Sequence, residues 1–178
     1  LFIGIIFIVL FLLSVPPIHL FKNGAGEMVE AILVINLLPA WGFIIQYGEV
    51  HRLLLLLTLP FTALMLAMRL AMSLENYGQD IRNGNKNLMT SMGWERGMSL
   101  HNYFIIFSFV VMAFTYVLGL PWKLVLPGLL SLPIGLYQIW QMRQIASGLK
   151  PNWKVLNFTA ISLLGVTAYL VALSLWIG

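Results

Sequence analysis

The sequence predicts an all-α bundle of membrane-spanning helices, and three observations support this fold class. Of the 178 residues, 60% are hydrophobic and only 9% are charged, whereas a soluble domain carries about 25% charged residues. The mean hydropathy is +0.91. Apolar runs long enough to cross the hydrocarbon core recur along the whole chain. Because backbone groups in lipid must form their hydrogen bonds within the spanning segment, these runs are expected to be helices.

There are six hydrophobic segments, and we expect them to form a single polytopic transmembrane domain covering residues 1–178. They comprise residues 1–13, 30–47, 53–74, 103–120, 125–142 and 155–177. Asn36 and Pro39 interrupt the second segment. Two connections are short enough for tight helical hairpins, at 48–52 and 119–124. The other three are longer and are expected to be loops, at 14–29, 75–102 and 143–154.

The chain opens on the apolar run LFIGIIFIVLFLL, without the basic region and small-residue end of a signal peptide. We interpret this run as the tail of a transmembrane helix, so the chain is expected to be an N-terminally truncated fragment. It contains no cysteine, which excludes disulfides, thiolate catalysis and Cys-ligated metals. The net charge of +4 is scattered and forms no basic face of the kind that nucleic acid requires.

Basic residues are distributed unequally between the two ends of the expected bundle. In an alternating bundle the three long connections lie at one end, which then holds Lys22, Arg82, Lys86, Arg96, Arg143, Lys150 and Lys154. The other end holds Arg52 and Lys123. This positive-inside bias predicts that the long loops are cytoplasmic. We therefore expect a multi-pass protein that is located in the inner membrane of a prokaryotic cell.

The stretch LENYGQDIRNGNKNLMTSMGWERG, residues 74–97, concentrates charged and amide side chains. If the third helix continues past Leu74, Asn76 and Asp80 share one face at i, i+4 and offer two oxygen ligands in one direction. Hard oxygen ligands beside the cation Lys86 suit a magnesium-bridged phosphate. On spacing alone, a solvated helix end is the stronger alternative, because Asn and Gly are ordinary residues at helix ends.

Residues 80–88, DIRNGNKNL, together with Gly93, resemble the second aspartate-rich motif of the UbiA-type membrane prenyltransferases, roughly D-x-x-x-D-x-x-x-G-K-x-T-L. Asp80 takes the place of the second aspartate, and Lys86 lies one place after the usual lysine. Three positions depart from the family pattern. These are Asn76 for the first aspartate, Asn87 for the threonine and Leu13 for a tyrosine that usually precedes Ser14.

A second stretch, SVPPIHLFKNGAGE from Ser14 to Glu27, is similar to a family loop that contains S-x-P-P, a lysine and G-x-G-E. Its G-x-G-E element is most similar to the menaquinone branch, the dihydroxynaphthoate polyprenyltransferases. The resemblance covers essentially the whole chain and corresponds to the later two-thirds of a nine-helix member. It implies about six helices of that fold.

The resemblance implies an integral membrane enzyme that moves a polyprenyl group from its diphosphate to an aromatic acceptor in quinone or lipid biosynthesis. Magnesium is the implied cofactor, and it would neutralise the diphosphate leaving group. The implied metal ligands are Asp80, which is also the catalytic residue, Asn76 and Glu75. The candidates for binding diphosphate are Lys86, Lys22 and Arg82. Because only one of the two aspartate-rich motifs is present, we expect the chain to be inactive alone.

Several of these residues have a second interpretation. Arg82 equally suits a surface charge of the positive-inside kind. Glu75 points about 100° away from Asn76 in an ideal helix and joins the metal site only if the helix ends there. Arg69 and Asn36 are candidates for the pocket that binds the acceptor and the prenyl chain. Snorkelling is slightly favoured for Arg69, and an interhelical hydrogen bond is as good an explanation for Asn36.

Other polar residues receive no site role. Gln138, Gln141 and Gln144 recur every third residue at a helix end, which a hydrated face explains. The histidines, His19, His51 and His101, have no metal spacing. Two other functions stay open: a non-catalytic relative, which Asn76 suggests, and a small-molecule transporter, in which Arg69 and Asn36 would line a path. A transporter would favour an internal repeat, and the sequence has none.

Overall fold

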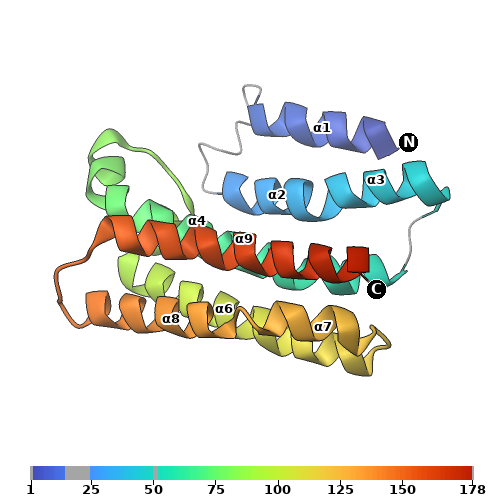
Figure 1. Ribbon diagram of the computed structural model, residues 1–178. Coiled ribbons are helices and arrows are strands. Elements are labelled where there is room, and N and C mark those ends of the chain that lie inside the picture. The colour runs from blue at the N-terminus through green and yellow to red at the C-terminus, as the bar shows by residue number, and fades with distance from the viewer. Residues whose placement is uncertain (1, 15–24, 50–51, 178) are drawn as a thin grey trace.

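The computed structural model describes residues 2–14, 25–49 and 52–177 (Figure 1), and every element within these ranges is helical. The chain runs through α1 (Phe2–Ser14), α2 (Gly26–Ile32), the π-helix η2 (Leu33–Leu37), α3 (Leu38–Tyr47), α4 (Arg52–Asn83), α5 (Leu88–Met92), α6 (Trp94–Val117), α7 (Trp122–Leu129), α8 (Leu132–Ala146) and α9 (Trp153–Ile177). The prediction of an all-α polytopic bundle is confirmed.

Five helical spans in the described part of the chain are long and apolar enough to cross a membrane. They are Gly26–Tyr47, Leu53–Asn83, Trp94–Val117, Trp122–Ala146 and Trp153–Ile177. The connections 84–93 and 147–152 lie together at one end of the bundle, on the left in Figure 1. We call this the polar end. The hairpin between α6 and α7 lies at the opposite end, as the short connection at 119–124 predicts.

The predicted loop 75–102 is wrong, because most of it is helical. α4 continues to Asn83, α5 occupies Leu88–Met92, and α6 begins at Trp94. The helix continues past Leu74 because Tyr77 still packs against the buried apolar cluster, and it ends where Gly84 adopts a positive φ of 70°. The predicted loops 14–29 and 143–154 also contain helical residues at their ends, since α2 begins at Gly26 and α8 ends at Ala146.

Two spans are not regular helices throughout. The predicted segment 125–142 is divided into α7 and α8 around Ser131, with Pro133 in the first turn of α8, where a missing N–H costs no hydrogen bond. The predicted interruption at Asn36 and Pro39 takes the form of η2, a π-turn between α2 and α3. Pro39 lies in the first turn of α3.

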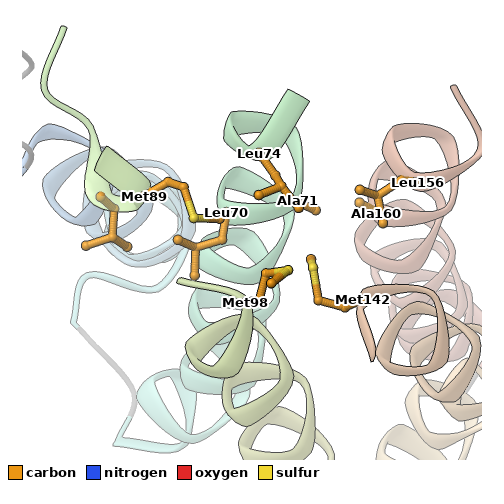
Figure 2. Close-up of a cluster of buried hydrophobic side chains, with 9 residues drawn as sticks. Leu70, Ala71, Leu74, Met89, Met98, Met142, Leu156 and Ala160 are labelled. Atoms are coloured by element: carbon orange, nitrogen blue, oxygen red, sulfur yellow. The ribbon is translucent and has the colours of Figure 1, made fainter. Parts of the chain in front are cut away.

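The buried core surrounds α4, which contacts α2, η2, α5, α6 and α9. Near the polar end, Leu70, Ala71 and Leu74 of α4 meet methionines from three other helices (Figure 2). These are Met89, Met98 and Met142. Flexible methionines fill the irregular space between helices that approach from different directions. This packing holds the start of α6 and the end of α8 beside the end of α4.

Gly135 allows the close approach of α6 and α8. A Cβ added at Gly135 of α8 would lie 2.6 Å from the ring of Phe109 and 3.1 Å from Ile105, both on α6. Lipid chains are as apolar as leucine, so helices in a membrane associate by packing and interhelical hydrogen bonds rather than by the hydrophobic effect. The glycine therefore allows the contact that brings the polar side chains of α6 and α8 within reach of one another.

Candidate functional site: the polar end and the contact of α2 with α4

Asp80 lies in the last turn of α4 and organises the turn that follows it. Its carboxylate oxygens accept hydrogen bonds from the side-chain amides of Asn85, at 3.2 Å, and Asn87, at 2.8 Å. The backbone N–H of Asn85 donates to the Asp80 carbonyl at 2.8 Å. Gly84 supplies the left-handed residue that this reversal needs. The motif-matched carboxylate is therefore half-buried and held by the residues that follow it.

Asn87, which stands where the family pattern has threonine, starts the next helix. Its side-chain oxygen accepts from the backbone N–H of Thr90 at 2.7 Å, while Thr90 Oγ1 accepts from the Asn87 N–H at 2.8 Å. This reciprocal pair is a capping box for α5. The amide group of Asn87 thus serves both ends of the turn: its NH₂ bonds Asp80 and its oxygen caps α5.

Glu27 connects α2 to the same turn. Its Oε2 accepts the backbone N–H of Leu88 at 2.6 Å, and its Oε1 accepts the hydroxyl of Ser73 at 3.1 Å. Glu27 belongs to the G-x-G-E element and Leu88 to the aspartate-rich stretch, so the described end of the first stretch meets the second stretch in space. No role was assigned to Glu27 from the sequence, although its place in the G-x-G-E element was a signal that could have singled it out.

Three further polar contacts join the span of α2 and η2 to α4, at increasing distance along the chain from Glu27. Glu30 of α2 forms an ion pair with Arg69 of α4. Asn36 of η2 accepts from Thr58 Oγ1 at 2.7 Å and donates to Thr62 Oγ1 at 2.8 Å. We refer to this set of contacts as the α2–α4 polar seam. It comprises Glu27, Glu30, Asn36, Thr58, Thr62, Arg69 and Ser73.

The seam contains Arg69 and Asn36, the two candidates for the pocket that binds the acceptor and the prenyl chain, and it changes the interpretation of both. The favoured snorkelling of Arg69 gives way to an ion pair, since its side chain is 33% exposed and that of Glu30 21%. The Nε atom of Arg69 is buried and has no hydrogen-bond partner among the residues described. Asn36 makes interhelical hydrogen bonds, which was one of its two interpretations. Both side chains are therefore already bonded to neighbouring helices.

The remaining candidates at the polar end differ in exposure and in their contacts. Asn76 is exposed one turn before Asp80. Lys86 and Arg82 are exposed, and neither has an ion-pair partner in the described ranges. Glu75 accepts a hydrogen bond from Asn157 of α9 at 2.6 Å, so it lies against α9 and does not join Asn76 and Asp80. Lys22 lies outside the described residues.

The donor set at Asp80 fits a sparse magnesium site. Each carboxylate oxygen of Asp80 accepts one amide hydrogen bond and keeps further acceptor capacity. Asn76 offers a carbonyl oxygen on the same face of α4. Magnesium commonly takes one or two carboxylates together with substrate phosphate oxygens. The described residues contain no group of three or more His, Asp or Glu side chains that could hold a metal ion, so phosphate oxygens would have to complete the coordination.

A second polar group, between α6, α8 and α9, was missed from the sequence. Gln138 is 0% exposed and His101 1% exposed, so the hydrated face expected for Gln138 is wrong. The Gln138 oxygen lies 3.2 Å from His101 Nε2, and its NH₂ donates to the Leu156 carbonyl at 2.8 Å and to Thr159. Thr159 in turn donates to Gln141 at 2.9 Å. We call these side chains the α6–α8–α9 network.

The chain was compared with known proteins at the level of families, curated sequences and solved structures. No family model, no curated protein and no solved structure matches it.

Proposed function

We propose that this protein is a UbiA-type prenyltransferase that binds a polyprenyl diphosphate at the polar end. One observation carries the proposal. The two stretches that resemble family motifs, 14–27 and 80–93, are 61 positions apart at their point of contact, where Glu27 accepts the N–H of Leu88. Contact between the two motifs is what a single ligand site built from both of them requires.

The side chains at this end have the chemistry that a diphosphate with a long apolar tail requires. Asp80 and Asn76 would hold Mg²⁺, which supplies charge neutralisation to a departing diphosphate. Lys86 and Arg82 are exposed cations without competing carboxylates in the described structure. The spans below them carry the apolar surface against which a prenyl chain packs. Glu27 and Asn87 act as positioning residues, because they hold the Asp80 turn.

Two other functions are the alternatives, and one observation favours the first while another counts against the second. A non-catalytic relative is favoured by Asn76, which adds no charge beside Asp80. Such a protein would bind the diphosphate without transferring its prenyl group. A transporter loses its main support, because Asn36 and Arg69 are bonded to Thr58, Thr62 and Glu30. Side chains that are paired in this way are poor candidates for a substrate path.

The test measures binding of a polyprenyl diphosphate to the chain in lipid vesicles, with and without Mg²⁺. Magnesium is expected to raise retention of the ligand, and Asp80→Asn is expected to remove that increase. Lys86→Gln is expected to weaken binding about tenfold, as expected for the loss of a charge-assisted hydrogen bond. Glu49→Gln, an exposed carboxylate after α3, is the matched control and should bind as the unaltered chain does. The proposal would be wrong if retention of the polyprenyl diphosphate were the same with and without Mg²⁺ and the same in Asp80→Asn as in the unaltered chain.

The chemical step is tested separately, because the resemblance implies that transfer needs two aspartate-rich motifs and these 178 residues carry only one. In a longer protein that contains both motifs, magnesium-dependent release of diphosphate and prenylation of dihydroxynaphthoate are measured together. Transfer that Asp80→Ala abolishes supports the enzyme. Diphosphate binding with no transfer under the same conditions identifies the non-catalytic relative instead.

The polar end is proposed to face the cytoplasm, since it holds most of the basic residues. The chain has no cysteine, so single cysteines report on their own positions. Cysteines that replace Asn85 and Asn152 should react with a membrane-impermeant thiol reagent only from the cytoplasmic side. A cysteine that replaces Gly48 should react only from the opposite side. Labelling in the reverse pattern would overturn the orientation.

A further inference from the structure

A cavity of about 490 Å³ lies between α6 and α8 at the polar end. Its volume is within the usual range for small-molecule sites. The lining side chains that matter here are Trp94, Glu95, Ser99, Asn102, Tyr103 and Arg143. None of them belongs to the α2–α4 polar seam or to the Asp80 turn, so the cavity is distinct from the proposed diphosphate site.

Two unpaired charges of opposite sign face this cavity from different helices. Glu95 lies in the first turn of α6 and Arg143 in the last turn of α8. Both line the cavity and both are exposed. Neither forms an ion pair or a side-chain hydrogen bond with any described residue, and they do not pair with each other. A molecule that carries an anion and a cation would satisfy both at once.

The uncharged polar groups of the cavity are placed to assist such a molecule. The exposed hydroxyl of Ser99 lies one helical turn after Glu95 and has no described partner. Asn102 is half-buried, and its side-chain oxygen lies 3.0 Å from Nδ1 of the buried His101. The amide is thereby fixed at the cavity wall. These groups add hydrogen-bonding capacity beside the two charges.

The apolar wall of the cavity has the composition of a surface where the bilayer meets water. Trp94 and Tyr103 are 42% and 67% exposed, and amphipathic aromatic rings favour the membrane interface. Ile106 continues the wall, and Val110 continues the same exposed face one turn further into the span. The cavity thus opens onto an apolar helix surface on one side and onto the charged polar end on the other.

We propose that this cavity binds the headgroup of a phospholipid that carries a primary ammonium beside its phosphodiester, as phosphatidylethanolamine does. The phosphodiester pairs with Arg143 and Ser99, and the ammonium pairs with Glu95. The acyl chains leave along Ile106 and Val110. An anionic lipid would satisfy Arg143 but leave Glu95 beside a like charge, and a soluble zwitterion would leave the apolar wall uncovered.

The experiment measures which lipids stay bound to the purified chain. The protein is delipidated in detergent and incubated with equal amounts of phosphatidylethanolamine, phosphatidylcholine and phosphatidylglycerol, and bound lipids are counted by native mass spectrometry. Phosphatidylethanolamine is expected to be retained best, because only its ammonium both carries charge and donates hydrogen bonds to Glu95. Equal retention of the three lipids would overturn the proposal.

Variants separate the two charges. Glu95→Gln is expected to lower retention of phosphatidylethanolamine about tenfold and to remove its advantage over phosphatidylglycerol. Arg143→Gln is expected to lower retention of all three lipids. Glu49→Gln and Lys154→Gln alter exposed charges outside the cavity and should change nothing. A similar loss in these controls would identify non-specific surface charge and overturn the site.

Two further measurements keep the result interpretable. Thermal unfolding of each variant in detergent is expected to match that of the unaltered chain, since both cavity charges are exposed and unpaired. Glycerophosphoethanolamine, the headgroup without acyl chains, is added as a competitor. It is expected to compete only at much higher concentration than the lipid. Equal competition would mean that the apolar wall contributes nothing, and the lipid assignment would be wrong.

Discussion

The α2–α4 polar seam and the α6–α8–α9 network both join neighbouring helices through polar side chains, but the seam uses charged groups and the network uses neutral ones. The seam contains ionised groups, Glu27, Glu30 and Arg69, and each is only partly buried. The network is built from neutral groups around His101 and Gln138, which are almost completely buried. In both regions a polar side chain on one helix bonds to a neighbouring helix. The two regions differ in how deeply these polar side chains are buried.

Desolvation explains this division. Removing a charge from water is costly unless it is well paired, and an uncharged amide can be fully buried if its hydrogen bonds are made. The burial of the spans agrees with this division: 17% of the apolar window of Gly26–Tyr47 is buried, against 33% for Trp94–Val117 and 33% for Trp122–Ala146, which carry His101 and Gln138. The span that carries α2 and η2 lies at the periphery of the bundle, so its charged side chains stay partly exposed. Substitutions in the buried network should therefore destabilise the protein more than substitutions in the seam.

The largest effect is expected for Gln138→Leu. The change removes hydrogen bonds to His101, Thr159 and the Leu156 carbonyl and leaves His101 Nε2, a buried polar group, without a described partner. The free energy of unfolding should fall by about 2–3 kcal/mol, because such a group costs about 1–3 kcal/mol. The measurement is unfolding by denaturing detergent in mixed micelles. Gln144→Leu is the control on the same helix. Its side chain makes no described hydrogen bond, and a loss as large there would contradict the comparison.

An intermediate effect is expected when the Glu30–Arg69 pair is broken. Arg69→Met leaves the Glu30 carboxylate without its cation, and Glu30→Gln leaves the guanidinium without its anion. Each should cost about 1 kcal/mol, less than a fully buried pair, because both groups are partly exposed. The double variant should lose less than the sum of the two. Strict additivity in this double-mutant cycle would show that the pair contributes no coupling.

The smallest effect is expected for Asn36→Leu. Two hydrogen bonds to α4 are lost, but Thr58 and Thr62 keep their bonds to backbone carbonyls of their own helix, at 3.4 Å and 3.0 Å. Interhelical hydrogen bonds in membranes average about 0.6 kcal/mol, so the total should be about 1 kcal/mol or less. The same unfolding assay measures it. A loss that exceeds the loss for Gln138→Leu would reverse the order of the two regions.

The spans and their alternation could be predicted because they depend on the chain's average hydrophobicity. Long apolar runs have few structural choices in lipid, and the short connection at 119–124 leaves its helices no option but a hairpin. The extension of α4 to Asn83 could not be predicted with the same ease. Its last two turns are polar in sequence, and they are helical because Tyr77 packs on the core and Glu27 holds the following turn from another helix.

The site was predictable in its residues and less so in its contacts. Asp80 was identified from its motif, whereas the roles of Asn85 and Asn87 as donors to Asp80 depend on a turn that the sequence does not specify. Gln138 was misread because the spacing of glutamines is the same for a hydrated face and for a face turned toward a neighbouring helix. Only the position of α9, which supplies Leu156 and Thr159, distinguishes the two.

The π-turn η2 has a consequence for how this protein can vary in length. A π-turn accommodates one residue more than the same rise of α-helix, and each α-helical residue turns the chain by about 100°. Glu27 and Glu30 precede η2, and Asn36 lies within it. Loss of one residue from Leu33–Leu37 would restore a regular α-helix of the same rise, so the halves of the span before and after η2 would keep their orientations. A relative one residue shorter in this span could therefore keep Glu30 opposite Arg69, and only the contacts made from within η2, those of Asn36 with Thr58 and Thr62, would have to be rebuilt.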